Sequence, residues 1–357
     1  MTTATKNTVD PNRIREFADT AGRLRTELAR RIIGLESVID DLLIALLSGG
    51  HCLLVGVPGL AKTLLIRSLA ELTDLSFRRI QFTPDLMPSD IVGTEVIVKD
   101  KDTGERTFQF MKGPVFAHVI LADEINRTPP KTQAALMEAM EERQVTSVGE
   151  RYRLDAPFFV LATQNPIEQE GTYPQPAAQL DRFLFNVWLD YPNQVDEKAI
   201  VRLTTTRGQA DLTPLLSRED ILSLLKLVRT IPASAEVLAY AVDIARRSRP
   251  RRQRAADFVN EWVAWGGGPR AAQALVVGGK ARALLHGRAE VLPEDLRAVA
   301  QPVFRHRIIT NFQAEADGVS AESIIERLIE STPAPDRAAV SDKPRSFWSR
   351  LFGPRGE

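Results

Sequence analysis

The stretch His51–Ala70, HCLLVGVPGLAKTLLIRSLA, decides the fold because it joins three kinds of local pattern. An apolar run, Cys52–Val55, leads into a turn rich in glycine and proline, and Ala61-Lys62-Thr63 then opens an amphipathic run. This order predicts a strand, a loop and a helix. A loop that brings a lysine and a hydroxyl to the start of a helix is typical of phosphate binding. Ala61, however, stands where the pattern G-x-x-x-x-G-K-[ST] has its second glycine.

The composition is that of an ordinary soluble protein of two domains. The chain has 357 residues, of which 44% are hydrophobic and 26% charged, and its 46 basic residues equal its 46 acidic ones. No global charge therefore favours nucleic acid or a membrane. The single cysteine, Cys52, excludes an internal disulfide, and four scattered histidines do not favour a zinc-type site. No apolar run is long enough for a membrane span, so we expect a cytoplasmic protein.

Three further runs indicate buried strands. They are HVILAD, FFVLATQN and FLFNVWLD, covering residues 118–123, 158–165 and 183–190. Such near-continuous apolar runs predict an α/β fold with a parallel sheet covered on both faces. The first three strands end in the phosphate loop, in Asp123-Glu124 and in Thr163-Gln164-Asn165. Because ligands bind at the carboxyl ends of such strands, we expect these groups to share one site.

The remaining patterns organise the chain around this core. Helical stripes precede it over residues 13–31 and 36–48, and alternating patterns over Glu95–Phe110 and Arg143–Asp155 predict projecting hairpins. After Tyr191-Pro192 the strand signals stop and helical ones continue to about Glu330. We therefore predict four parts: an N-terminal helix, a nucleotide-binding core, a helical lid and a disordered basic and aromatic tail, over residues 1–30, 31–191, 192–331 and 332–357.

The loop after the first strand can hold a phosphate chain. Gly56 and Gly59 let successive N–H groups point inward, and the helix N-terminus adds a partial positive charge. Lys62 would reach the β and γ phosphates, and Thr63 would give its hydroxyl to magnesium. We expect Ala61 to be tolerated because a helical φ in the first turn accommodates its Cβ.

The polar strand ends supply the groups that hydrolysis of a phosphate chain requires. Asp123 can hold the water shell of Mg²⁺, Glu124 can polarise the attacking water, and the Asn165 amide can bind both that water and the γ phosphate. Arg182, directly before a strand, and Arg270, at the head of a helix, could stabilise the charge of the transition state. Each arginine taken alone could equally be a surface residue.

In combination these segments resemble the MoxR family of AAA+ ATPases. The resemblance is carried by RIIGLESVI, GVPGLAKT, PSDIVGTEV, GPVFAHVILADEINRTPPKTQAALMEAMEE, FFVLATQNPIEQEGTYPQPAAQLDRFLF and GPRAA, and it covers roughly residues 31–309. It implies an AAA+ P-loop core with an insertion in helix 2, over Met87–Phe110, followed by a small all-α lid. Alanine is usual in that family at the position of Ala61.

The resemblance also implies roles for particular residues. Lys62 and Thr63 would be Walker A, Asp123 and Glu124 Walker B, Asn165 sensor 1, Arg182 the arginine finger and Arg270 sensor 2. The implied nucleotide-binding positions are Ile32, Ile33, Gly34, Gly56, Pro58, Gly59, Leu60, Ala61, Lys62, Thr63, Leu64 and Asp123, with Mg²⁺ on Thr63 and Asp123 largely through water. One departure is Gly266-Gly267-Gly268-Pro269, where the family has Gly-Ala-Ser-Pro, which predicts a looser hold on Arg270.

The family implies ring oligomers, hexamers by expectation, that use ATP and Mg²⁺ to remodel or assemble client enzymes. A protein with a von Willebrand factor A domain often takes part, in assembly or in metal or cofactor insertion. Three alternatives stay open: a nucleic-acid motor of the same clade, a magnesium chelatase-type motor subunit, and a nucleotide-locked scaffold. The mixed charges of the hairpin tips, Lys99–Asp102 and Gly149–Arg151, do not favour nucleic acid, and intact Glu124 and Asn165 do not favour a scaffold.

Two basic segments remain outside this scheme. In the tail KPRSFWSRLFGPR, aromatic and basic residues recur at helical spacing, which predicts a docking element for a partner or an anionic membrane, or else a disordered tail. The run RPRRQR, Arg249–Arg254, is the densest basic segment; it indicates nucleic-acid contact or a solvated face of the lid.

Overall fold

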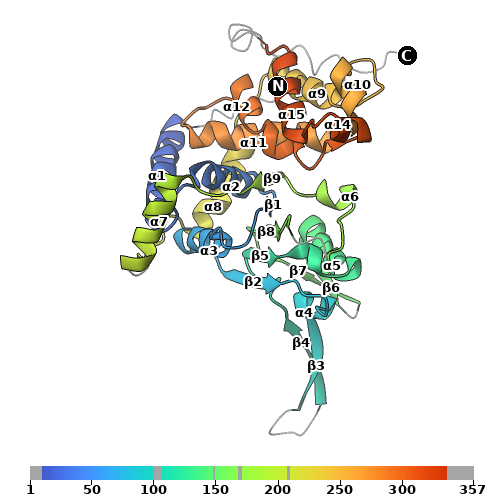
Figure 1. Ribbon diagram of the computed structural model, residues 1–357. Helices are drawn as coiled ribbons and strands as arrows, with labels where there is room; N and C mark the ends of the chain where they lie inside the picture. Colours follow the sequence, from blue (N-terminus) through green and yellow to red (C-terminus); the bar gives the residue numbers. More distant parts are fainter. Residues whose placement is uncertain (1–9, 100–105, 148, 168–170, 207–209, 336–357) are drawn as a thin grey trace, which may run out of the picture. The chain divides into compact units, whose positions relative to one another are not determined.

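The computed structural model describes residues 10–99, 106–147, 149–167, 171–206 and 210–335 (Figure 1). These residues form two compact units, which we call the sheet unit (the described residues of 19–226) and the helical unit (the described residues of 1–18 and 227–357). The division passes through two helices, α1 (Pro11–Ala29) and α8 (Arg218–Thr230).

The sheet unit is built around a parallel sheet. Within the described residues its strand order is β2-β5-β8-β1-β9, and every neighbouring pair is parallel. Its strands are β1 (Cys52–Val55), β2 (Phe77–Gln81), β5 (Val119–Asp123), β8 (Phe159–Gln164) and β9 (Phe185–Trp188). The predicted sheet is confirmed, but strand prediction missed β2. The sequence of β2, FRRIQ, lacks a continuous apolar run because β2 is an edge strand with exposed positions.

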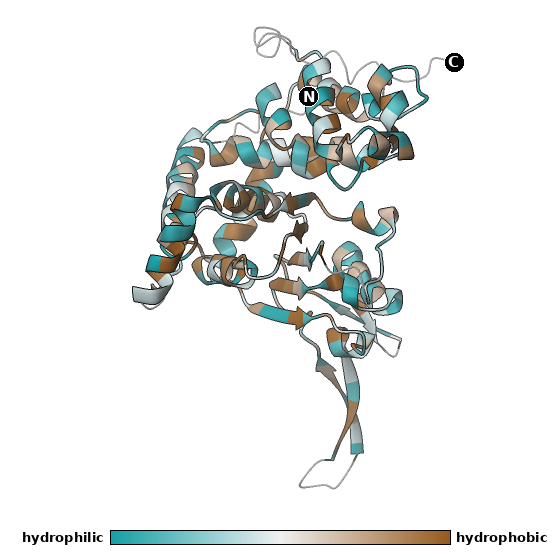
Figure 2. Cartoon of the chain, in the orientation of Figure 1, coloured by the Kyte–Doolittle hydropathy of each residue, from teal (hydrophilic) through white to brown (hydrophobic). Residues whose placement is uncertain are grey.

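The sheet unit also contains several helices. They are α2 (Glu36–Ser48), α3 (Lys62–Leu72), α4 (Pro88–Val92), η1 (Ile125–Arg127), α5 (Pro130–Glu142), α6 (Ala177–Leu180) and α7 (Gln194–Thr206). Among them, α2 contacts β9 and α3 contacts β5. On one face of the sheet, Leu53, Ile120 and Val160 form a core cluster with Leu136 and Met137 of α5. Burying each such side chain contributes roughly 1.5–3 kcal/mol. Figure 2 shows the central strands as strongly hydrophobic.

Two antiparallel hairpins extend the sheet unit, as the alternating patterns predict. The first pairs β3 (Gly93–Lys99) with β4 (Arg106–Lys112) and projects away from the sheet in Figure 1. The second pairs β6 (Gln144–Ser147) with β7 (Glu150–Arg153). The base of the first hairpin requires glycine. Gly93 has φ 104°, and a Cβ there would lie 2.2 Å from the carbonyl oxygen of Met111.

The helical unit confirms that the predicted lid is mainly helical. Its helices are α9 (Ala235–Arg247), α10 (Asp257–Trp262), α11 (Pro269–Leu285), α12 (Pro293–Ala298), α13 (Ala300–Phe304), α14 (Phe312–Ala316) and α15 (Ala321–Ser331). The expectation that strands end at Pro192 is wrong in one detail, since β10 (Val263–Trp265) and β11 (Ile309–Thr310) form a short antiparallel pair. Strands this short leave no periodic pattern in a sequence.

The glycine-rich segment before Arg270 is tightly packed, contrary to the looser loop that its composition predicts. A Cβ on Gly266 would lie 2.0 Å from the carbonyl oxygen of Ser248, and one on Gly267 would lie 2.6 Å from the Phe304 ring. The Gly267 N–H also donates to Ser248 Oγ at 2.9 Å. Gly266 and Gly267 therefore permit close packing of the segment before α11.

Within the described residues, none of the helices combines the length and apolarity that crossing a bilayer requires. The tail element predicted from KPRSFWSRLFGPR falls in residues 336–357, outside the described residues.

Candidate active site

The phosphate loop joins β1 to α3, as the opening stretch predicts. Gly56 follows β1, and a Cβ on it would lie 2.8 Å from the Leu189 side chain, so packing after β9 requires glycine there. Gly59 has φ 87°, a conformation that only glycine adopts without strain. Lys62 begins α3 and donates from Nζ to the carbonyl oxygen of Gly56 at 2.6 Å. The lysine is thus folded back over the loop that it would serve.

Ala61 adopts a left-handed conformation, with φ 53° and ψ 22°, at the N-cap of α3. The expectation of an ordinary helical φ is therefore wrong. A non-glycine residue in this region costs about 1–2 kcal/mol, and alanine, with only a Cβ, adds no further bulk. The glycine of the usual pattern is explained by this backbone geometry, and Ala61 tolerates the same geometry at a cost in strain.

Sheet register brings the polar strand ends together at one edge. In β1 and β8, Leu54 lies opposite Thr163 and Val55 opposite Gln164. The pairing of β5 with β8 aligns Ala122 with Ala162, which places the residues after them, Asp123 and Thr163, side by side. Gly56 at the start of the phosphate loop donates its N–H to the Gln164 carbonyl oxygen at 3.2 Å. The sequence-based expectation that these three strand ends share one edge is confirmed.

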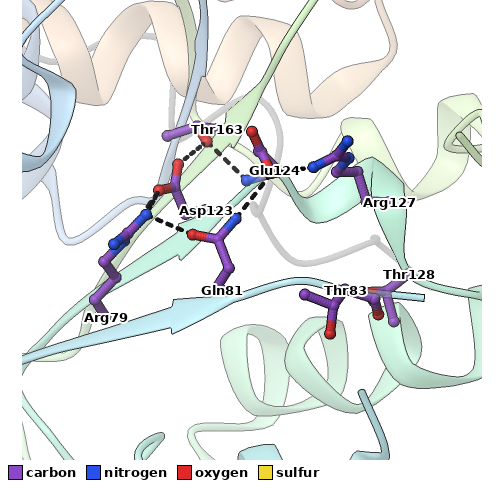
Figure 3. Close-up of polar contacts among 8 residues, drawn as sticks. All are labelled: Arg79, Gln81, Thr83, Asp123, Glu124, Arg127, Thr128 and Thr163. Carbon is purple, nitrogen blue, oxygen red and sulfur yellow. Dashed lines mark hydrogen bonds and ion pairs between the residues drawn. The ribbon is translucent and has the colours of Figure 1, made fainter. Parts of the chain in front are cut away.

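Asp123 is buried at this edge, and both of its carboxylate oxygens accept hydrogen bonds (Figure 3). Its Oδ1 accepts a hydrogen bond from Thr163 Oγ1 at 2.6 Å, and its Oδ2 accepts from Nη2 and Nε of Arg79 at 2.6 and 3.0 Å. A buried carboxylate needs such partners because desolvation penalises its charge. Arg79 therefore neutralises the carboxylate that the sequence assigns to magnesium.

Glu124 follows Asp123 in a left-handed conformation, with φ 58° and ψ 47°, which turns the chain sharply at the end of β5. Its N–H donates to Thr163 Oγ1 at 2.9 Å. Its carboxylate Oε2 accepts from Gln81 Nε2 at 2.8 Å and from Arg127 Nη1 at 3.0 Å (Figure 3). Strained backbone of this kind persists where the surrounding structure fixes it, and it is common at functional sites.

The sequence analysis missed the contribution of β2. Arg79 and Gln81 are two residues apart on this strand, so both side chains leave the same face, and Gln81 lies opposite Asp123 in the register of β2 and β5. The available sequence signal was the pair Arg79 and Gln81 in FRRIQF, which stand two residues apart, as residues on one face of a strand do. Recognising it required knowing that β2 neighbours β5.

The other candidate residues lie in different settings. Asn165 directly follows β8, is buried, and accepts the N–H of Ile167 on Oδ1 at 3.2 Å. Arg182, just after α6, pairs through Nη2 with Glu141 Oε2 at 2.8 Å, while its buried Nε has no hydrogen-bond partner within the described residues. Arg270 is in the first turn of α11 and belongs to the helical unit, whereas the other candidates belong to the sheet unit.

Gly34 occupies a turn between α1 and α2 where its φ of 76° favours glycine. A Cβ on it would lie 2.8 Å from Asp196 Oδ2, in the first turn of α7. Gly34, the last residue of the predicted adenine-side segment Ile32–Gly34, therefore packs against the N-terminal end of α7.

The residues at the strand ends fit a magnesium ion bound together with a nucleotide. No cluster of three or more His, Cys, Asp or Glu side chains able to hold a metal is present in the part of the chain that the structure describes. Mg²⁺ is usually held by one or two protein oxygens together with waters and substrate phosphates. The carboxylate of Asp123 and the hydroxyl of Thr63 are donors of that class.

His51 directly precedes β1, and its ring contacts the backbone of two other elements of the sheet unit. Its Nδ1 accepts the Val160 N–H at 3.0 Å, so the ring proton is on Nε2, which faces the Met140 carbonyl oxygen at 3.2 Å. Burial, and then the positive charge of Arg143, lower the pKa of His51 to about 3. This histidine is therefore a neutral structural link between β1, β8 and α5.

Comparisons with known proteins agree with this geometry. A family model described as "ATPase family associated with various cellular activities (AAA)" matches residues 51–185, and an AAA lid domain model matches residues 255–328. "Chaperone MoxR1" of Mycobacterium tuberculosis is 40% identical over 90% of this chain and 84% of its own. "Protein MoxR" of Methylorubrum extorquens is 29% identical over 92% of this chain and 100% of its own. The solved structure of a putative ATPase from Cytophaga hutchinsonii is 39% identical, with a TM-score of 0.84 over 91% of this chain and 98% of that one.

Proposed function

Because the chain belongs to the MoxR family of AAA+ ATPases, we propose that it hydrolyses ATP in a ring of identical subunits to remodel or assemble client proteins. One observation carries the proposal. The phosphate loop, Asp123-Glu124 and Thr163-Asn165 meet at one edge of a parallel sheet, although they are far apart in sequence. This is the arrangement that places a γ phosphate between a lysine and a carboxylate.

In the proposed reaction Lys62 leaves the Gly56 carbonyl and binds the β and γ phosphates, and the N–H groups of the loop hold the rest of the phosphate chain. Glu124 accepts a hydrogen bond from the attacking water and orients it in line with the γ phosphate, and the Asn165 amide fixes the same water. A bound Mg²⁺ would be held by Thr63 and Asp123 and would withdraw charge from the phosphate oxygens.

The two Walker B carboxylates must exchange partners for this to happen. Arg79 has to release Asp123, and Glu124 has to leave Gln81 and Arg127. We propose that nucleotide binding drives this exchange, because the phosphates supply the competing charge.

Arg182 is the proposed arginine finger, acting on the nucleotide of a neighbouring subunit. Its pairing with Glu141 holds it within its own subunit in the present conformation. Arg270 is the proposed sensor of the helical unit. The boundaries of the core, 31–191, and of the lid, 192–331, also stay predictions, and limited proteolysis with mass spectrometry would test them.

A protein client is favoured over nucleic acid by the projecting hairpin. Ile97 and Phe108 face each other across β3 and β4 and are 60% and 73% exposed. An exposed cross-strand apolar pair is suited to protein contact. A partner with a von Willebrand factor A domain, cofactor or metal insertion into a client enzyme, hexameric rings and a cytoplasmic location complete the proposal.

The first test is ATP hydrolysis with Mg²⁺ by the wild type, by Glu124→Gln and by Glu315→Gln, which alters an exposed carboxylate of α14. We expect Glu124→Gln to bind ATP, to lose at least about 100-fold in turnover, and to sediment as a larger assembly with ATP. Glu315→Gln should match the wild type. Equal turnover in all three proteins would refute the role of Glu124.

A mixing experiment tests the arginine finger separately. Arg182→Ala and Glu124→Gln should each be inactive alone. If Arg182 acts in the neighbouring site, an equal mixture of the two should recover about a quarter of wild-type activity, because a Glu124→Gln subunit can supply Arg182 to an intact site beside it. No recovery, with mixed assemblies confirmed by sedimentation, would contradict action across the subunit interface.

A further inference from the structure

A cavity of about 540 Å³ in the helical unit is lined almost entirely by arginine. It lies at the end of α9 and along the loop to α10, and this volume falls within the range of about 300–1,000 Å³ for small-molecule sites. We call this space the arginine cavity. Its lining residues are Arg246, Arg249, Arg251, Arg252, Gln253 and Arg254. The basic run that the sequence analysis left unexplained therefore converges on one space.

The positive charge of the arginine cavity is only partly compensated. Arg254 pairs with Asp243 Oδ1 at 2.6 Å, and that carboxylate is shared with Arg247. Within the described residues, the guanidinium groups of Arg246 and Arg252 make no hydrogen bond or ion pair. Burial, and then the charges of these two arginines, lower the pKa of Arg249. Gathering like charges in this way costs free energy that a bound anion would recover.

The loop that carries these arginines is fixed by specific hydrogen bonds. Arg251 has a left-handed φ of 58°, and its N–H donates to Asn260 Oδ1 at 2.6 Å. Arg249 donates from Nε to the Gly267 carbonyl oxygen at 2.7 Å, and the Gly267 N–H donates to the buried Ser248 hydroxyl. A purely solvated loop would need neither the strained residue nor these contacts.

We propose that the arginine cavity binds a compact polyanion with at least two linked phosphate groups. Guanidinium forks match phosphate oxygens in pairs, and several forks around one cavity match adjacent phosphates. The six lining residues include no aromatic, Leu, Ile, Val or Met side chain, so the cavity has neither an aromatic platform for a base nor a hydrophobic pocket for the apolar side chains of a peptide. The recognised element is the phosphate chain itself.

A ligand bound in the arginine cavity would also affect the segment before α11. Arg249 contacts the ligand space and, through Nε, the Gly267 carbonyl, three residues before Arg270. A ligand that orders Arg249 would also order Gly266–Pro269. This gives the inferred site a readout that does not depend on ATP hydrolysis.

Inorganic tripolyphosphate is the probe, titrated calorimetrically into the full chain at constant ionic strength. All proteins carry Lys62→Ala, so that the phosphate loop contributes little. We expect one site per chain, weakened about tenfold or more by Arg246→Gln with Arg252→Gln, since each loses charged hydrogen bonds to the ligand. Arg15→Gln with Arg23→Gln, which removes the same charge from exposed positions of α1, should leave the affinity unchanged.

Hydrogen exchange locates the site independently. Tripolyphosphate should slow exchange in peptides covering residues 246–271 of the parent protein but not of the Arg246→Gln, Arg252→Gln variant, whose melting temperature should match that of its parent. If both double variants lose the same amount of tripolyphosphate affinity, the assignment of a phosphate site is overturned. It is also overturned if the parent protein binds a hexaglutamate peptide as tightly as tripolyphosphate. Tight binding by both double variants, with no protection of these peptides, would place the ligand elsewhere and also refute the proposal.

Discussion

Acidification should weaken the sheet unit through a single buried ring, His51. Its Nδ1 accepts the Val160 N–H, and its surroundings are the Met140 carbonyl, the Phe158 ring at 5.7 Å and the cation of Arg143. Protonation would place a second charge in this buried space and would break the hydrogen bond to Val160. The folded state therefore holds the neutral ring.

The size of the effect follows from the two pKa values. The pKa of His51 falls from 6.5 to about 3 on folding. Between these two pH values the His51 ring binds a proton in the unfolded chain but not in the folded chain. The stability that this neutral ring contributes is present above pH 6.5 and is lost as the pH falls toward 3. Between pH 7 and pH 5 the loss amounts to about 2 kcal/mol of unfolding free energy, at ~1.4 kcal/mol per pH unit.

Hydrogen exchange of peptides from β1 and β8, corrected for intrinsic rates, measures this free energy in the sheet unit at both pH values. The matched variant is His51→Gln, which keeps an amide donor but does not titrate. It should be less stable at pH 7, yet its stability should fall by about 2 kcal/mol less than that of the wild type on going to pH 5. If both proteins lose the same amount, His51 is not the group responsible and the reasoning fails.

Three further substitutions test other parts of the fold. Asp295→Asn removes the charge of a buried carboxylate that accepts two hydrogen bonds from Arg288, so calorimetry should show a loss of about 3 kcal/mol in the helical unit. Gly93→Ala should cost at least about 2 kcal/mol and speed hydrogen exchange in β3 and β4, because its Cβ would meet the Met111 carbonyl; unchanged exchange would contradict this geometry. Ala61→Gly should relieve left-handed strain of about 1 kcal/mol, offset in part by the entropy of glycine, and should keep ATP affinity; a clear loss of stability by chemical denaturation would argue against the conformation of Ala61.

Much of the site could be predicted because its chemistry is local. Continuous apolar runs ending in polar residues gave β1, β5 and β8, and the parallel arrangement of such strands implied a common edge, which the register of Asp123 and Thr163 confirms. The helical pattern of the lid and the two hairpins followed from periodicity in the same way. Each of these inferences needs only neighbours along the chain.

What the sequence by itself determined, then, was the type of element, the order of elements and the identity of the chemical groups, because periodicity and loop composition act over a few residues. Tertiary structure alone decided which groups meet. Arg79 and Gln81 became partners of Asp123 and Glu124 only because β2 lies beside β5, and separated glycines such as Gly93 and Gly266 became necessary only where another backbone approaches within contact distance. Such contacts depend on sheet order and packing between distant segments, which no local pattern encodes.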